Sequence, residues 1–296
     1  MKGPVVSIII PTYYKSVQTL AIPLKSIADQ RCPKDVFEVI IVDNYGGEII
    51  RSLARRNKAR FTEVKGEPSQ LCHQINTGAK IARGRYILLL DHDIEIGPNL
   101  IRDLVKMVRK RTDIGAWYIP YRIIARGKIL TRIRNFEEEF YRDSVIAAPR
   151  LIKKSIFSKL QWDPKVSAGA PDWDFTIQMK LLGIKFDYLK NYFYHHEEQM
   201  SFWESISKKM IYSEGGQVYR RKWKNNNLQV YKSIVVKQYD PFFRLFGIFV
   251  DKGNWRRLLG SLDIYILFLL VKILMLVIYL YYLHIGVKIN QKIKWT

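Results

Sequence analysis

The sequence predicts an α/β protein built on a doubly wound sheet. Three short apolar runs rich in β-branched residues indicate buried strands, namely Val5–Ile10, Phe37–Val42 and Tyr86–Leu90. The first run ends at a proline and the other two lead into aspartates, Asp43 and Asp91. Helical periodicity lies between the runs, and such alternation favours a parallel sheet that binds ligands beyond the carboxyl ends of its strands.

Apolar residues at helical spacing predict three helices. The first has its stripe at Val17, Leu20, Ala21, Leu24, Ile27 and Ala28. We expect Pro23 to kink it, because proline lacks the N–H of a helical hydrogen bond. An Arg-rich second helix begins with Ile49, Leu53 and Ala54. The third has its stripe at Leu100, Ile101, Leu104, Val105 and Val108, with Pro98 favoured in the first turn.

Three segments describe the organisation of the chain. Residues 1–110 are expected to form a nucleotide-binding half, and residues 111–227, rich in Tyr, Trp and Arg, an acceptor-side half of the same domain. Residues 228–296 form a basic, membrane-proximal segment with one apolar helix at about 262–285.

This last helix is apolar from Ile264 to Leu283 except for Lys272. About 20 apolar residues suffice to span a bilayer, so a transmembrane helix is the first interpretation. A lysine near its middle costs roughly 2.5–3.5 kcal/mol on insertion, so a helix lying in the plane of the membrane is the alternative. Basic residues flank both ends, so the charge pattern fixes no orientation.

Composition narrows the function classes. A formal net charge of +22 requires some face to meet phosphates, of a nucleic acid, a membrane or a substrate. The basic residues form no recognisable nucleic-acid module, so no nucleic-acid partner is expected. No GxGxxG follows the first strand and no GxxxxGK[ST] loop is present, which disfavours a dehydrogenase and a P-loop ATPase. The two cysteines, Cys32 and Cys72, have no metal or disulfide spacing, which indicates a reducing, cytoplasmic setting.

Paired carboxylates end the third strand. If the extended conformation persists through Asp91, His92 and Asp93, the two aspartates share one face and the histidine points away. Two carboxylates there suit Mg²⁺ or Mn²⁺, which would neutralise the charge of a departing nucleoside diphosphate. Taken alone, a pair of aspartates more often only ends a strand.

Five motifs follow one another along the chain, namely Val6–Tyr13 (VSIIIPTY), Val39–Asn44 (VIIVDN), Asn76–Ala79 (NTGA), Gly84–Asp93 (GRYILLLDHD) and Ala170–Phe175 (APDWDF). In this order they resemble family-2 glycosyltransferases of the GT-A fold, and the middle of the chain resembles archaeal-type, membrane-associated members. The resemblance covers about residues 5–220. It implies a mixed sheet flanked by helices, a nucleotide-diphosphate sugar as donor, and transfer with inversion.

The resemblance also implies roles at the donor end. Pro11 and Tyr13 would line the nucleobase pocket and Asp43 would contact the base. Asp93 would bind the metal directly, and Asp91 would assist or contact the ribose.

At the acceptor end the resemblance implies that Asp172 is the catalytic base. A base suits an inverting transfer, because the acceptor hydroxyl loses its proton as it attacks. Helix capping is the structural alternative for Asp172, and Asp174 is expected to orient or begin the helix. In this family a histidine often supplies a third metal ligand at the place of His195 and His196. We expect His196 to be that ligand.

Two departures from the family pattern bear on activity. Pro171 replaces an acidic neighbour of the base, and Leu160–Asp163 stands where a Gly-Gly-Phe-Asp type of turn is common. Because of these departures, a catalytically inactive protein that binds nucleotide sugars remains the alternative.

The expected function is transfer of a hexose to a lipid-linked or cell-surface glycan at a membrane, with membrane lipids as partners and a cytoplasmic catalytic domain. Transfer to a polyprenyl phosphate is an alternative. Its oxygen is already ionised, so Asp172 slightly favours a hydroxyl acceptor.

Overall fold

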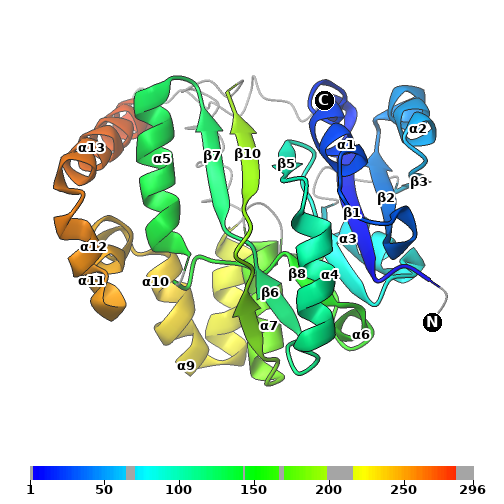
Figure 1. The fold of residues 1–296 in the computed structure, drawn as a ribbon. Coiled ribbons are helices and arrows are strands. Elements are labelled where there is room, and N and C mark those ends of the chain that lie inside the picture. Colours follow the sequence, from blue (N-terminus) through cyan, green and yellow to red (C-terminus); the bar gives the residue numbers. More distant parts are fainter. Residues whose placement is uncertain (1–2, 65–70, 143, 167–169, 199–215, 285–296) are drawn as a thin grey trace. The chain divides into compact units, whose positions relative to one another are not determined.

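The computed structural model describes residues 3–64, 71–142, 144–166, 170–198 and 216–284 (Figure 1). The chain divides into two compact units. Unit 1 comprises residues 1–122 and 148–196, and unit 2 comprises residues 123–147 and 197–296. Each unit is described by itself below.

Unit 1 is built on a mixed sheet of seven strands in the order β3-β2-β1-β4-β8-β6-β9. The strands are β1 Val6–Tyr13, β2 Phe37–Asn44, β3 Arg60–Glu63, β4 Tyr86–Leu89, β6 Ala116–Tyr118, β8 Leu151–Lys153 and β9 Phe186–Tyr188. β1 pairs in parallel with β2 and β4, and β2 with β3. β8 is antiparallel to both β4 and β6. The three strands expected from the sequence and the mixed sheet are confirmed.

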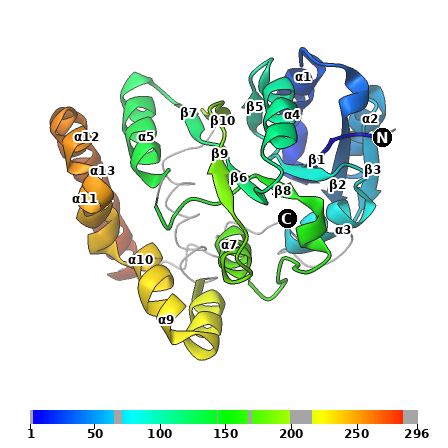
Figure 2. The ribbon, with the colours of Figure 1, turned by 60° about the horizontal axis from the view of Figure 1, so that its bottom comes forward.

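Helices cover both faces of this sheet. One core joins one face of the sheet, with residues such as Ile8 and Ile41, to α1, α2 and α4. A second core joins the other side, such as Ile9 and Ile40, to α3, α6 and α7. Figure 2 shows α1 and α4 on the opposite side of β1 from α3. The near-continuous apolar strands are explained by this burial on both faces.

The helix bounds in unit 1 are α1 Ala21–Ala28, α2 Gly47–Arg56, α3 Leu71–Ile81, α4 Leu100–Lys110, α6 Lys154–Phe157 and α7 Pro171–Leu181, with 3-10 turns at Tyr14–Gln18 and Lys34–Val36. All five residues of the predicted α4 stripe are buried. The expected kink at Pro23 is wrong. The α-helix begins at Ala21, so Pro23 lies in its first turn, where a missing N–H costs nothing.

Strand β1 runs further than the sequence indicates, through Pro11 to Tyr13. The amide of Leu90 donates to the carbonyl of Ile9 at 3.0 Å, so Ile9 faces β4. Pro11, two residues on, faces the same side, but β4 has ended at Leu89. No ladder hydrogen bond is therefore lost at the proline.

Two short strands precede and contain the histidine pair His195 and His196. They are β9 Phe186–Tyr188 in the main sheet and β10 Phe193–Glu197. β10 pairs antiparallel with β5, Ile94–Ile96, so that His195 lies opposite Ile94. This pairing brings the two histidines beside the aspartate motif.

Unit 2 is helical. Its elements are most of β7 Tyr121–Ala125, then α5 Lys128–Tyr141, a helix at 216–226, α9 Leu228–Val230, π-turns at Tyr231–Val235 and Phe243–Gly247, α10 Val236–Tyr239, α11 Ile248–Val250, a 3-10 turn at Asp251–Gly253, α12 Trp255–Leu259 and α13 Leu262–His284. Its core packs α5 against α11 and α13 through aromatic rings. The ring of Phe249 stacks on that of Phe136 with centroids 5.4 Å apart, and its centroid lies 5.2 Å from that of Phe268.

A buried ion pair joins α13 to α5. Lys272 Nζ lies 2.5 Å from Glu137 Oε1, and the side chains are 19% and 3% exposed. Arg134 and the Tyr141 hydroxyl also bind the Glu137 carboxylate, at 2.7 and 2.6 Å. Burial would raise the pKa of Glu137, but Lys272 and Arg134 overcome it and hold that pKa well below its usual range.

Within the described part of the chain, no helix is both long and apolar enough to cross a membrane. The spanning helix expected at about 262–285 is therefore not supported, and residue 285 lies outside the described residues. The expected boundary at residue 110 does not coincide with the division into units. The main sheet continues past it into β6, β8 and β9.

The Lys272→Met variant should lose about 3 kcal/mol of unfolding free energy, because removal of one partner leaves a poorly compensated buried charge. Urea denaturation followed by circular dichroism measures the loss. Lys272→Met combined with Glu137→Gln should recover part of it, because the buried charge is then removed as well. A single variant as stable as the wild type would contradict the role assigned to this pair.

Candidate active site

Asp43 ends β2 and holds the turn into α2. Its carboxylate accepts the Thr12 hydroxyl at 2.8 Å and the amides of Gly46 and Gly47 at 2.7 and 3.1 Å. A Cβ on Gly46 would lie 2.5 Å from Asp43 Oδ1, so the turn requires glycine there. Asp43 is fully buried, and this burial raises its pKa despite the three donors. As folded here, its side chain shapes the strand end and is not exposed to a nucleobase.

Tyr13 lies at the neighbouring strand end, in register with Asn44. Its ring packs edge-on against His92, with centroids 5.4 Å apart. His92 Nδ1 in turn lies 2.6 Å from the Thr19 hydroxyl. Pro11 is buried two residues before Tyr13. The ends of β1 and β2 and the histidine of the aspartate motif therefore form one surface.

The aspartate motif does not continue as a strand. β4 ends at Leu89, and His92 and Asp93 lie in a turn closed by the amide of Ile94, which donates to the carbonyl of Asp91 at 3.2 Å. The expected alternation of side chains is therefore wrong. Asp91 and Asp93 instead have different partners.

Asp93 faces β10. Its Oδ2 lies 3.3 Å from His195 Nε2, whereas His196 Nε2 lies 2.9 Å from Glu95 Oε2. Neighbouring residues of a strand point to opposite sides, which explains why the two imidazoles have different carboxylate partners. The His196 amide also donates to the Asp93 carbonyl at 3.0 Å. Both histidines therefore lie beside the motif, with the His195 imidazole at the Asp93 carboxylate, and the choice of His196 as a third metal ligand stays a prediction.

Asp91 faces a buried arginine. Arg150 Nη2 lies 3.5 Å from Asp91 Oδ2, and the Arg150 side chain is only 17% exposed. The backbone of Arg150 is fixed between β4 and β6. Its carbonyl accepts the amide of Leu89 at 2.8 Å, and its amide donates to the carbonyl of Trp117 at 3.0 Å. The guanidinium also lies over the ring of Tyr121, 5.7 Å from the centroid. Among the described residues its Nε has no hydrogen-bond partner.

Asp172 occupies the first turn of α7, where Pro171 is the first helical residue. Its Oδ1 accepts the amide of Trp173 at 2.9 Å. Burial raises the pKa of Asp172; Arg150 lowers it and Asp91 raises it further. The same neighbours, with Tyr121, raise the pKa of Arg150 against the effect of its burial. The structure thus brings Asp91 and Asp172 together around one cation.

This arrangement suits proton transfer. A carboxylate with a raised pKa accepts a proton more readily near neutral pH than an ordinary aspartate does. Asp174, in contrast, is buried and accepts the Gln178 amide at 2.7 Å, in keeping with the orienting role expected for it.

The donor set fits a hard divalent cation only in part. Among the described residues no three His, Cys, Asp or Glu side chains form a cluster that could hold a metal ion. Mg²⁺ commonly takes one or two protein carboxylates and completes its shell with water and substrate phosphates. Asp91 and Asp93 with a bound diphosphate therefore suit Mg²⁺ or Mn²⁺, both of which prefer oxygen ligands.

The two departures from the family pattern are ordered parts of the fold. Trp162 exchanges two hydrogen bonds with the side chain of Asn76, at 2.8 and 3.0 Å, and is 3% exposed. Pro171 suits the first position of a helix, where its fixed φ is already helical. Neither residue displaces Asp172 from the turn.

Sequence reasoning did not identify Arg150 or Tyr121 as parts of the site. The available signal was a single arginine between an apolar stretch and the strand Leu151–Lys153. In a chain with 49 Lys and Arg residues that signal is weak. Thr19, the partner of His92, had no signal at all.

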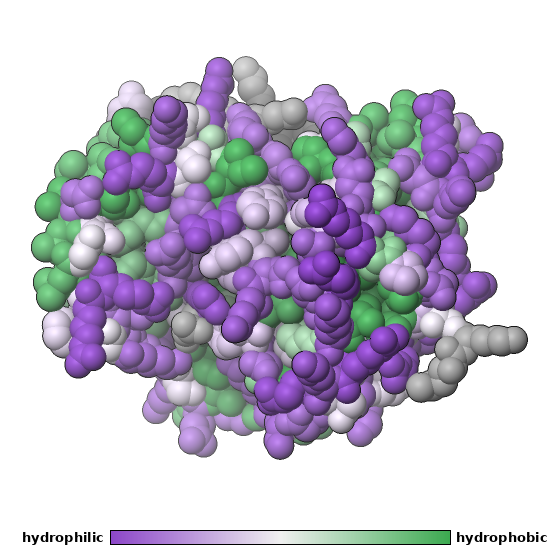
Figure 3. Space-filling model, in the orientation of Figure 1, coloured by the Kyte–Doolittle hydropathy of each residue, from purple (hydrophilic) through white to green (hydrophobic). Residues whose placement is uncertain are grey.

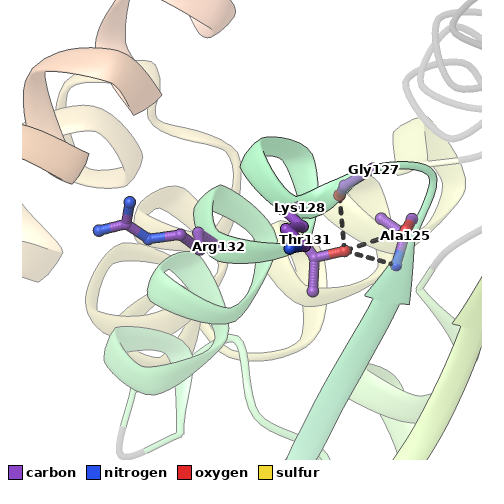
Figure 4. Close-up of a pocket in the computed structure, with 5 residues that line it drawn as sticks. All are labelled: Ala125, Gly127, Lys128, Thr131 and Arg132. Atoms are coloured by element: carbon purple, nitrogen blue, oxygen red, sulfur yellow. Dashed lines mark hydrogen bonds between the residues drawn. The ribbon is translucent and has the colours of Figure 1, made fainter.

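A separate hollow of about 540 Å³ lies in unit 2, lined by Ala125, Gly127, Lys128, Thr131 and Arg132 (Figure 4). Figure 4 shows the Thr131 hydroxyl bound to the backbone of Ala125 and Gly127. This hydroxyl closes the turn before α5. The hollow contains no carboxylate and is not assigned to the reaction.

Comparison with known proteins gives consistent results. A family model described as Glycosyl transferase family 2 matches residues 7–165, more than half of the 296 residues. An uncharacterized glycosyltransferase of Methanocaldococcus jannaschii is 27% identical over 253 residues, covering 78% of this chain and 86% of its own length. The poly(ribitol-phosphate) β-N-acetylglucosaminyltransferase TarP of Staphylococcus aureus is 22% identical over 262 residues, covering 83% and 78%.

Solved structures agree in fold. The mannosyltransferase PcManGT from Pyrobaculum calidifontis, in complex with GDP-Man and Mn²⁺, has a TM-score of 0.61 at 16% identity, covering 93% of this chain and 81% of its own. S. aureus TarS 1–349 in complex with UDP-GlcNAc has a TM-score of 0.58 at 20% identity, covering 83% and 76%. At these identities the likeness shows the fold alone.

We expect Asp43→Ala to lower the unfolding free energy by about 1–3 kcal/mol, because the buried Thr12 hydroxyl and the amides of Gly46 and Gly47 lose their acceptor. Thermal unfolding followed by circular dichroism measures the change. Asp35→Ala, at an exposed site, is the matched control and should be neutral within about 0.5 kcal/mol. Equal stability of the two variants would contradict the structural role of Asp43.

Proposed function

The chain belongs to glycosyl transferase family 2 and has the GT-A fold, and from this premise we propose its reaction. It transfers a sugar from a nucleotide-diphosphate sugar, with inversion, to a hydroxyl of a lipid-linked or cell-surface glycan. The observation that carries the proposal is the cluster of Asp91, Arg150 and Asp172, which sets a carboxylate of raised pKa beside the aspartate motif.

In the proposed reaction the acceptor oxygen attacks the anomeric carbon as its proton passes to the Asp172 carboxylate. The bond from that carbon to the diphosphate oxygen breaks on the opposite face, and the nucleoside diphosphate leaves with the bonding electrons. General-base assistance of this kind contributes typically about 10²–10⁴-fold to the rate.

Asp93 and Asp91 are the residues that would hold Mg²⁺ or Mn²⁺, with His196 or His195 as a third candidate. Such a cation would neutralise the charge that develops on the diphosphate. The complex of PcManGT with GDP-Man and Mn²⁺ supports this choice by analogy of fold.

The donor end has Tyr13 and Pro11 at the end of β1 and Asn44 at the end of β2. Tyr13 is partly exposed, whereas Asn44 and Asp43 are buried. We therefore assign contact with the nucleobase to Tyr13, with Asn44 and Asp43 behind it as support. Neighbours bound to UDP-GlcNAc and to GDP-Man leave both uridine and guanosine donors open.

A hydroxyl acceptor follows from Asp172. A polyprenyl phosphate is ionised at neutral pH and gains nothing from a base, so the buried Asp172 favours the hydroxyl. A protein that only binds nucleotide sugars is the remaining alternative, and the experiment below separates the two.

The first test is sugar transfer from a panel of UDP- and GDP-sugars to a membrane lipid extract, with Mg²⁺ or Mn²⁺. Asp172→Asn should lower kcat by about 10²–10⁴-fold through loss of the base. Asp93→Ala should lower the rate by about 100-fold or more and weaken its dependence on the metal. Asp35→Asn, at an exposed site, serves as the control.

A wild type that binds nucleotide but transfers no sugar would establish the binding protein instead. Full activity of Asp172→Asn with a phosphate acceptor would point to polyprenyl phosphate. Full activity of that variant with a hydroxyl acceptor would remove Asp172 from the mechanism.

The second test uses the pH dependence of kcat/KM. A base whose folded pKa is raised is lost to protonation as the pH falls through that raised value, so activity should fall on the acid side. Arg150 lowers the pKa of Asp172, so Arg150→Leu should move this limb to higher pH. Arg150→Lys keeps the charge and should leave the limb closer to that of the wild type. An unmoved limb in Arg150→Leu would argue against coupling of the two residues.

A further inference from the structure

The outer face of α12 and α13 is an extended apolar surface. Its large hydrophobic residues are each 45–60% exposed, namely Trp255, Leu259, Leu262, Ile266, Leu270, Ile273, Leu274, Leu276, Val277, Leu280 and Tyr281. Figure 3 shows hydrophobic side chains gathered at its left edge, where α12 and α13 lie in Figure 1. Exposed apolar patches of this extent mark interaction surfaces on proteins.

The opposite face of α13 is already occupied within unit 2. Ile264 and Phe268 are buried in the aromatic core with α5. Lys272, the only charged residue between positions 264 and 281, is turned to Glu137 beneath the helix. From position 264 to position 281 the outer face therefore carries no charged residue, and the penalty of placing a lysine in lipid does not arise there.

Cationic side chains border the apolar face at its amino-terminal end. Arg256 and Arg257 on α12 are exposed, and the Arg256 guanidinium lies over the Trp255 ring at 5.4 Å from the centroid. Arg132 on α5 lies 3.6 Å from Asp263 in the first turn of α13. Tryptophan and arginine at the edge of an apolar face are typical of helices at a lipid–water interface.

Net charge decides between two possible occupants of this face. A second copy of the chain would bring together two bodies of +22 each, and their repulsion opposes association. An anionic lipid surface is attracted by the same charge, by about 1 kcal/mol for each basic residue near it.

We propose that the outer face of α12 and α13 rests on an anionic lipid surface, with α13 lying in the plane of the interface. The inference deepens the proposed function, since it would hold the enzyme at a membrane where a lipid-linked acceptor resides. It does not require a spanning helix. Apolar contact supplies the affinity, and the arginines at the edge supply the preference for anionic headgroups.

Sedimentation of the full chain with vesicles tests the proposal without donor or acceptor. The vesicles contain phosphatidylcholine alone or with about one third phosphatidylglycerol, an anionic composition that the basic edge should favour. The test variant carries Ile266→Glu, Ile273→Glu and Val277→Glu, at positions 53–58% exposed. The matched control carries Ile49→Glu, Leu181→Glu and Leu182→Glu, at positions 50–60% exposed in unit 1.

The wild type and the matched control should bind anionic vesicles more tightly than neutral ones, and salt should weaken the binding. The test variant should lose at least about tenfold in partitioning while keeping its thermal unfolding curve. Undiminished binding by the test variant, or no binding by the wild type, overturns the proposal. A wild-type dimer that the test variant abolishes, in sedimentation equilibrium without lipid, identifies a second copy as the occupant instead. If the wild type binds vesicles, the test variant loses that binding and the wild type transfers no sugar, this inference stands and the proposed reaction is refuted.

Discussion

Parallel pairing of β1 with β2 and β4 is the constraint on which the site depends. It brings the carboxyl ends of three strands to one edge of the sheet, and Tyr13, Asp43 and Asp91 are attached there. The ends of β1 and β2 are held together by Gln74 on α3, which donates to the carbonyls of Thr12 and Val42 at 2.7 Å each. This buried side chain fixes the two strand ends without a ligand.

Beyond that edge, charge compensation organises the acceptor side. Asp91 raises the pKa of Asp172, and the guanidinium of Arg150, which lies 3.5 Å from Asp91, lowers it. The aromatic ring of Tyr121 covers the guanidinium, which keeps it from competing hydration. The contacts of Arg150 with Asp91 and Tyr121 thus serve both the proposed chemistry and the stability of the site.

Regular elements could be predicted from the sequence because their signal is local. The stripe of α4 and the three central strands depend only on spacing within about a dozen residues. The contact of His195 with Asp93 and that of Arg150 with Asp91 join residues 59 or more positions apart. Such pairings are set by the sheet order, which spacing alone does not reveal. The family resemblance supplied the roles of Asp93 and Asp172, but not the arginine between the proposed base and the motif.

The ion pair between Lys272 and Glu137 has a consequence for how α13 is aligned along its neighbour. A helix rich in Leu, Ile, Val and Tyr offers many near-equivalent ways to slide along α5. A slip of four residues displaces a helix by about 6 Å along its axis, which would leave Glu137 buried without this cation. The ion pair therefore fixes the register of α13 along α5. It favours one alignment among several that hydrophobic packing alone would make similar in energy.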